Sequence, residues 1–415
     1  MKENRFFGWY VVYATHILLA LIFGAAYSFG AFFSHIQSSF SAGSFSVASI
    51  FSLTALLYYI VGVFSGTLAD RLSPRAVVIT GIALLSMGFF ASSFLSFSLH
   101  WFILCFGLLV GLGVGLVYVP AITTTQRWFI TRRSQASGIA LAGTGVGTFI
   151  GPTAAGWLMQ SLSWEATLRI FAVFILISGV LAGCLMRSKP EAYGLLPDGE
   201  KKNENSPPGS GKASAGSGFR EAVTAAPFWW YFSAIFLGSV GLFLALVHIN
   251  PYARQFSLSA SEANLLIGLI GVGNVAGRLF LGRAGDRMGP RRLLQYLTFS
   301  LALLNLFWLE AHSFWSLAIF ALLFGVANGG CIALYPAVAA GWYGTTNLGA
   351  ILGALYISVG VAAVAGGSLG GLLFDLSHTY SASILFSTFC ALLSVLCIIM
   401  ARRAVNKGTN ISAID

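Results

Sequence analysis

Two copies of one short motif decide the fold of this chain. The first copy, GTLADRLSPR, covers residues 66–75, and the second, GRAGDRMGPR, covers residues 282–291. Their aspartates, Asp70 and Asp286, hold the same place in the two copies. Trp128 and Trp342 form a second pair, and each follows an apolar stretch. The two tryptophans are almost as far apart along the chain as the two aspartates. Two offsets that agree this closely indicate an internal duplication.

The composition indicates that most of the chain lies in a membrane. Of its 415 residues, 57% are hydrophobic and only 9% are charged, and the mean hydropathy is +0.82. Soluble domains carry roughly 25% charged residues, so an ordinary soluble enzyme is excluded. The five cysteines lie inside apolar stretches without metal-ligand spacing, so we expect neither disulfides nor a metal site.

Twelve apolar stretches, each bounded by charged or turn-forming residues, are long enough to cross a bilayer, which takes about 20 residues. If both termini are cytoplasmic, 20 of the 23 basic residues fall in cytoplasmic segments, as the positive-inside rule requires. We therefore predict cytoplasmic N- and C-termini. Topology then explains the net charge of +10, and we expect no nucleic-acid partner. The predicted spans are 7–33, 44–69, 75–95, 101–123, 134–160, 166–187, 227–250, 261–284, 291–311, 315–340, 347–373 and 381–402.

A polar segment rich in glycine, serine and proline interrupts the apolar pattern at residues 188–220. Such a composition is typical of a flexible linker, and the predicted topology makes it cytoplasmic. The chain therefore divides into an N-terminal six-helix half (1–187), a linker (188–226), a C-terminal six-helix half (227–402) and a cytoplasmic tail (403–415).

The paired motifs, the six-plus-six arrangement and the central linker resemble the major facilitator superfamily of secondary transporters. That resemblance implies an all-α membrane protein of twelve transmembrane helices, with two parallel halves and a substrate site between them near the middle of the membrane. It also implies that the charged motif residues latch a cytoplasmic gate, whereas they could instead simply anchor tight turns at the membrane surface. The residues assigned to gating on this basis are Asp70, Arg71, Arg75, Asp286, Arg287 and Arg291.

Arg278 lies deep in a predicted span, about 17 residues from its outer end, whereas all 13 acidic residues lie in loops or at helix ends. A charged side chain at this depth costs roughly 3 kcal/mol or more. An anionic substrate would offset that cost, because the guanidinium matches a carboxylate. The alternative is an arginine that snorkels toward the cytoplasm or bonds backbone carbonyls. A single cation favours a monoanion.

Other polar residues of the spans are candidates for the same substrate site. Asn274, one turn before Arg278, could donate to the carboxylate, orient the guanidinium or bond a neighbouring helix. His248 could bind substrate, carry a proton or be a structural histidine. For the remaining candidates a packed side chain with a bonded polar group is the default. They are Tyr27, Tyr118, Asn328 and Tyr335.

Within the superfamily, the chain resembles the monocarboxylate transporters and the bacterial oxalate/formate antiporter-like proteins. The resemblance rests on Gly8-Trp9-Tyr10, Tyr27-Ser28-Phe29-Gly30, Tyr118-Val119-Pro120, Arg127-Trp128-Phe129 and the N-x-x-x-G-R run that ends at Arg278. It implies that Arg278 binds the carboxylate and that Tyr27 and Tyr118 line the cavity. Two residues depart from the family pattern: Asn274 replaces the aspartate of proton-coupled animal members, and Val359 replaces the lysine of oxalate exchangers. The second departure favours monocarboxylates.

We therefore predict a multi-pass transporter of the inner (plasma) membrane that carries lactate- or pyruvate-like monocarboxylates by alternating access with proton symport. The proton would ride on His248 or enter with the carboxylate at Arg278. The alternative is an organic-anion exchanger of the oxalate/formate type, which needs internal substrate for uptake. No nucleophile, metal cluster or phosphate-binding loop is visible in the sequence, so we expect no enzymatic activity, and no cofactor beyond the coupling proton. We expect the monomer to be functional.

Overall fold

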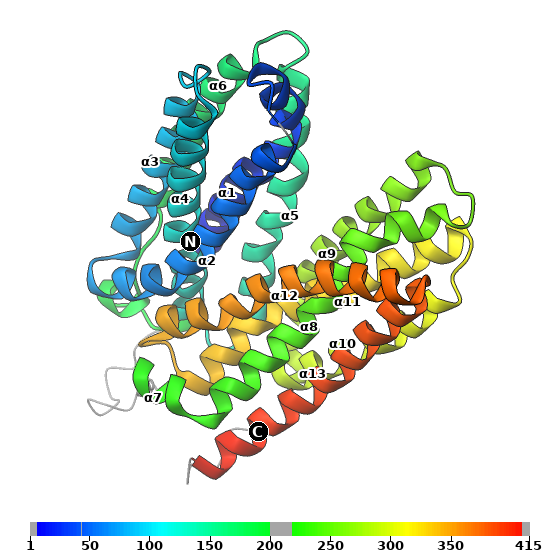
Figure 1. Ribbon diagram of the computed structural model, residues 1–415. Coiled ribbons are helices and arrows are strands. Elements are labelled where there is room, and N and C mark those ends of the chain that lie inside the picture. The colour runs from blue at the N-terminus through cyan, green and yellow to red at the C-terminus, as the bar shows by residue number, and fades with distance from the viewer. Residues whose placement is uncertain (1–5, 43, 200–217, 409–415) are drawn as a thin grey trace, which may run out of the picture. The chain divides into compact units, whose positions relative to one another are not determined.

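The computed structural model describes residues 6–42, 44–199 and 218–408, and the regular secondary structure in these ranges is helical (Figure 1). Long helices stand at each of the predicted spans, mostly within a few residues of the predicted ends. Their bounds are α1 (Gly8–Ser39), α2 (Ser44–Arg71), α3 (Pro74–Ser92), α4 (Leu99–Trp128), α5 (Arg133–Leu158), α6 (Trp164–Cys184), α8 (Ala226–Arg254), α9 (Ala260–Met288), α10 (Pro290–Leu309), α11 (Phe314–Tyr343), α12 (Leu348–Ser377) and α13 (Tyr380–Gly408).

Eleven of these long helices are long and apolar enough to cross a membrane. Within the part of the chain that the structure describes, α5 is the long helix that falls short, because its glycine, serine and threonine residues lower its hydropathy. The same small residues give α5 its packing. It presents Gly143, Gly147 and Gly151 to α1 at intervals of one turn, and a Cβ at Gly147 would lie 2.1 Å from the carbonyl oxygen of Ala20. Small residues at this spacing let two helix backbones touch inside a membrane.

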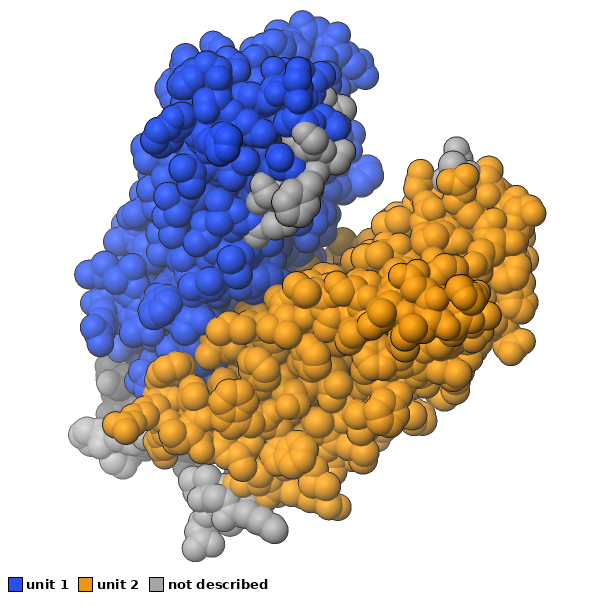
Figure 2. Space-filling view, viewed as in Figure 1, with its two compact units in different colours: residues 1–216, 345–353 blue, residues 217–344, 354–415 orange. Residues whose placement is uncertain are grey.

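The helices group into two compact units, coloured separately in Figure 2. Unit 1 comprises residues 1–216 and 345–353, and unit 2 comprises residues 217–344 and 354–415. The start of α12 therefore groups with the N-terminal half, although α12 belongs to the C-terminal half by sequence.

The predicted linker is partly folded. Two short 3-10 turns, η1 (Pro190–Tyr193) and η2 (Pro197–Gly199), follow α6, and a short helix, α7 (Phe219–Thr224), precedes α8. Each 3-10 turn begins at a proline, whose fixed φ suits a helical turn, and η1 ends at Gly194 with a φ of 69°. The composition predicts a flexible segment here, and the structure describes two short helical turns within residues 190–199. Its central part, residues 200–217, lies outside the described ranges.

Candidate functional site

Arg278 is buried in the interior of α9, with 8% of the residue exposed. The acidic residues found in the long helices of the described ranges all lie within the first or last turn of their helix. The buried cation and the acidic residues of the described helices thus lie at different places along their helices. This distribution of charge is the one that the sequence predicts.

Four glycines hold α9 against α11 around this arginine. A Cβ at Gly277 would lie 2.0 Å from the carbonyl oxygen of Val326, and a Cβ at Gly329 would lie 2.0 Å from that of Asn274. Only glycine fits such a contact, and the glycines recur one turn apart on both helices, as in other close helix pairs of membranes. The four are Gly273, Gly277, Gly325 and Gly329.

Asn274 and Asn328 form an amide pair across this contact. The Nδ2 of Asn274 donates to the Oδ1 of Asn328 at 3.0 Å, and Asn328 is almost fully buried. Of the three roles that the sequence leaves open for Asn274, the structure shows the bond to a neighbouring helix. The pair ties α9 to α11 one turn from Arg278, so it helps to fix the height at which the guanidinium emerges from the helix.

His248 and Tyr335 also take part in contacts between helices of unit 2. The Nε2 of His248, on α8, lies 3.0 Å from the carbonyl oxygen of Gly367 on α12, and its ring lies 5.7 Å from that of Tyr380. A carbonyl only accepts, so Nε2 carries a hydrogen, and Nδ1 is the atom that can take a second proton. The carbonyl of Tyr335 accepts from the hydroxyl of Tyr231 at 2.9 Å, which joins α11 to α8.

The two tyrosines predicted for the N-terminal half meet at one aromatic side chain. The ring of Phe23 lies 6.2 Å from that of Tyr27 and 5.4 Å from that of Tyr118. Tyr58, on α2, lies 6.4 Å from the same ring, and 4.1 Å from the ring of Tyr59. Tyr58 and Tyr59 are not among the candidates predicted from the sequence. The offset between the two motif copies could have identified Tyr58, because it makes this residue the repeat equivalent of Asn274, which lies one turn before Arg278.

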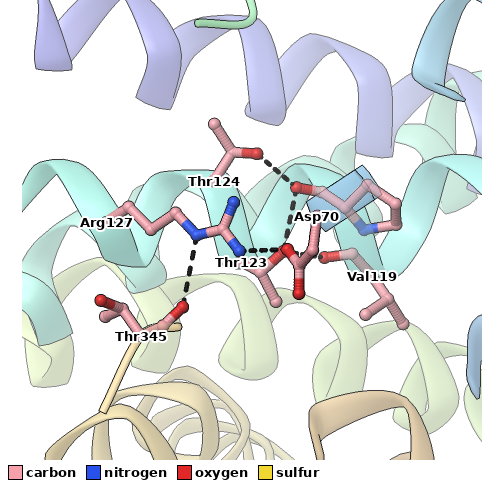
Figure 3. Close-up of polar contacts among 7 residues, drawn as sticks. Asp70, Val119, Thr123, Thr124, Arg127 and Thr345 are labelled. Atoms are coloured by element: carbon pink, nitrogen blue, oxygen red, sulfur yellow. Dashed lines mark hydrogen bonds and ion pairs between the residues drawn. The ribbon is translucent and has the colours of Figure 1, made fainter. Parts of the chain in front are cut away.

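Asp70, at the end of α2, pairs with Arg127 in the last turn of α4 (Figure 3). The Nη2 of Arg127 donates to the Oδ1 of Asp70, and its Nε donates to the carbonyl oxygen of Thr345 at 3.4 Å. Both charged side chains are largely buried. We call Asp70 and Arg127 the gate pair, after the gating role that the family resemblance predicts for Asp70. The guanidinium joins the end of α2 to the segment just before α12.

The partner of Asp70 is not the one that the motif suggests. Arg71 is exposed, and Arg75 donates instead to the carbonyl of Cys184, the last residue of α6. A cation at this position complements the partial negative charge of the helix end. Arg127 is not among the residues that the sequence assigns to gating, although it stands next to Trp128, which belongs to the repeat.

In unit 2 the second motif copy lies at the turn between α9 and α10. Asp286 is partly buried near the end of α9, Arg287 is exposed, and Arg291 is partly buried at the start of α10. Their assignment to gating stays a prediction.

Glycines bring α2 against the start of α12 close to the gate pair. A Cβ at Gly66 would lie 2.1 Å from the carbonyl carbon of Gly349, and a Cβ at Gly353 would lie 2.4 Å from the carbonyl oxygen of Gly62. The backbones of α2 and α12 therefore touch at two positions along α2. The gate pair and these glycines hold the same segment, residues 345–353, within unit 1.

The sequence pattern of the major facilitator superfamily matches residues 15–295 and again 242–413, which together cover most of the chain. The chain belongs to the major facilitator superfamily. Its all-helical fold and its apolar helices agree with this membership, and the protein is a multi-pass membrane transporter.

Several curated relatives of this superfamily member are named monocarboxylate transporters. Monocarboxylate transporter 12-B of Danio rerio is 29% identical over 410 residues, which cover 94% of this chain and 86% of the relative. Monocarboxylate transporter 13 of Rattus norvegicus is 28% identical, with coverage of 91% and 84%. Monocarboxylate transporter 6 of Homo sapiens is 27% identical, with coverage of 94% and 79%. The resemblance stated from the sequence motifs is confirmed.

Solved structures share the fold. The superfamily transporter FucP in its outward conformation, from E. coli, gives a TM-score of 0.68 at 16% identity, with 94% of this chain and 99% of FucP covered. The human organic anion transporter MFSD10 gives a TM-score of 0.70 at 17% identity, with 95% and 99% covered. The predicted major facilitator fold is thereby confirmed.

Proposed function

We propose that this transporter carries small monocarboxylates, such as lactate or pyruvate, by alternating access in symport with protons. The observation that carries the proposal is the buried guanidinium of Arg278 in the interior of α9. A transported carboxylate would offset the cost of burying that charge. The names of the relatives support a monocarboxylate as the substrate.

The packing of α9 supports a role for Arg278 as the carboxylate anchor. The glycine contact with α11 and the Asn274–Asn328 bond hold this part of α9 against α11. A rigid backbone limits the arrangements that the guanidinium can adopt, which lowers the entropy lost when it binds a carboxylate in bidentate fashion. One such cation neutralises one negative charge, so a monoanion leaves the site uncharged.

We infer that the gate pair closes the cytoplasmic side of the transporter. Its guanidinium contacts the carbonyl of Thr345, and α12, which begins three residues later, continues into unit 2. A rearrangement of the two units would therefore pull on this contact through the chain itself. We further infer a functional monomer in the plasma membrane with both termini in the cytoplasm.

Uptake of labelled L-lactate into proteoliposomes, with and without an inward proton gradient, tests the proposal. We expect gradient-driven uptake into empty vesicles and its loss, by a factor on the order of 100, in Arg278→Gln, because a buried charged partner is worth about 2–5 kcal/mol. Arg283→Gln is the matched control, since Arg283 is an exposed arginine on the same helix. Normal uptake by a folded Arg278→Gln protein would contradict the assignment.

Two further arms of this experiment separate the remaining alternatives. Uptake that requires vesicles preloaded with an organic anion would make the protein an exchanger. His248→Gln keeps an N–H donor for the carbonyl of Gly367 and removes the second ring nitrogen, Nδ1. Loss of proton-driven uptake in this variant would assign the proton to His248, and retention would assign it to the carboxylate at Arg278.

A further inference from the structure

The segment that follows α6 is folded against the loop between α4 and α5. We call residues 187–199 the strap. They contain both 3-10 turns, and Pro190 within them is buried. Neither Arg278 nor the gate pair lies in this segment, and its composition predicts that it should have little structure. Its contacts therefore need another explanation.

The far end of the strap is held by Asp198. Its Oδ2 accepts from the backbone nitrogens of Ile130 and Thr131, at 2.8 and 2.9 Å. These two N–H groups belong to the loop that precedes α5. Asp198 reaches them with a left-handed backbone, at a φ of 61°, a region that aspartate enters more readily than most residues. The carboxylate also lies close enough to Arg133 for their charges to attract.

The near end of the strap is held by Trp128, the first residue after Arg127. The indole Nε1 of Trp128 donates to the carbonyl of Arg187 at 2.9 Å, and Trp128 is fully buried. The guanidinium of Arg187 lies over two rings, 3.7 Å from the centroid of Phe7 and 4.5 Å from that of Tyr193. Cation–π contacts of this kind add to the packing of the rings.

The strap thus forms hydrogen bonds with Trp128, Ile130 and Thr131, which follow Arg127 along the chain. Because Arg127 donates to both Asp70 and Thr345, the position of this loop sets the reach of its guanidinium. We propose that the strap positions the gate pair and that Asp198 is its positioning residue. The proposal rests on the gating role given to Asp70 and Arg127 under the proposed function.

Labelling of a reporter cysteine with a maleimide tests this role in nanodiscs, where both faces of the protein are open to the reagent. The reporter is Thr345→Cys in a Cys184→Ser background, because Cys184 is the exposed native cysteine among the described residues. The substitution keeps the backbone carbonyl that Arg127 contacts. We expect Asp198→Ala to raise the labelling rate on the order of fivefold, the lower end of typical coupling between sites.

Two control variants show whether the bonds of Asp198 matter. Asp198→Asn keeps an oxygen that can accept from the loop, so its labelling rate should stay near that of the parent. Glu191→Ala removes an exposed acid of the same segment and should change nothing. If Asp198→Ala fails to fold, Tyr193→Leu loosens the near end of the strap and should raise labelling in the same direction. Unchanged labelling in folded Asp198→Ala protein would overturn the proposal.

A double-mutant cycle distinguishes positioning of the gate pair from a general structural role. In an Asp70→Asn background the gate pair is already weakened, so Asp198→Ala should add little further labelling. Fully additive effects would show that the strap acts elsewhere and would overturn the proposal. The readout is independent of which substrate is carried, so a failure of lactate uptake and a failure of the strap proposal are distinguishable.

Discussion

The helices α2 and α9 occupy equivalent positions in the repeat, yet they differ in what they contact and bury. The offset that relates Asp70 to Asp286 also relates Gly62 to Arg278. In α2 this position touches the backbone of residue 353 at the start of α12. In α9 the equivalent residue is the buried cation, Arg278. The close backbone contact of α9 is made by the preceding residue, Gly277, which touches α11.

The residue that could pair with the aspartate of the motif also differs between the two halves. At the offset that relates Trp128 to Trp342, the equivalent of Arg127 is Gly341, which has no side chain to bond an aspartate. A Cβ at Gly341 would meet no atom within 4 Å. The motif is therefore present in both halves, while the residues around it differ: the first half has the Asp70–Arg127 pair, and the second has the buried Arg278.

The largest effect should come from breaking the glycine contact that holds Arg278 in place. In Gly277→Val even the Cβ would lie 2.0 Å from the carbonyl oxygen of Val326, so α9 and α11 must separate. Overpacking of this kind costs about 1–3 kcal/mol or more. We expect a lower thermal midpoint and loss of lactate uptake.

The control for this variant is Gly268→Val, because a Cβ at Gly268 on the same helix meets no atom within 4 Å. Its uptake and thermal midpoint should stay close to those of the parent. Normal uptake by Gly277→Val would mean that the position of Arg278 does not depend on the α9–α11 contact.

A smaller effect is expected at the glycine contact between α2 and the start of α12. A Cβ at Gly66 would lie 2.1 Å from the carbonyl carbon of Gly349, whereas a Cβ at Gly62 would meet only a methyl group of Val119, at 3.3 Å. Gly66→Ala should therefore lower the maximal rate of uptake several-fold with little change in KM, because it disturbs the gate and not the anchor. Gly62→Ala should leave both nearly unchanged. Equal effects of the two variants on the uptake kinetics would contradict this reading of α2.

The features that the sequence predicts well are those set by the bilayer and by the repeat. Helix positions follow from the length of each apolar stretch, and Arg278 stands out because a charge in a span is costly. The partners of Asp70 and Asn274 could not be predicted, because each bond joins residues on different helices whose rotation a single sequence does not reveal. Asp198 escaped notice for a related reason: composition reports local flexibility, whereas its two bonds are made to a loop from which α5 and α6 separate it along the chain.

The smallest effect should come from Tyr58, the α2 residue equivalent to Asn274. Tyr58 shares the ring of Phe23 with Tyr27 and Tyr118, the tyrosines that the family resemblance places in the cavity. Tyr58→Phe keeps the ring and removes one hydroxyl, whose hydrogen bond would be worth about 0.5–1.5 kcal/mol.

We therefore expect Tyr58→Phe to raise the KM for lactate by about two- to tenfold, which is that energy range converted to a ratio, without lowering the thermal midpoint. Asn274→Ala, in contrast, should lower the thermal midpoint, because it removes the amide that donates to the buried Asn328. Should both variants lower the midpoint and leave KM unchanged, the two equivalent positions would share a structural role. The division of tasks between α2 and α9 would then be confined to Gly62 and Arg278.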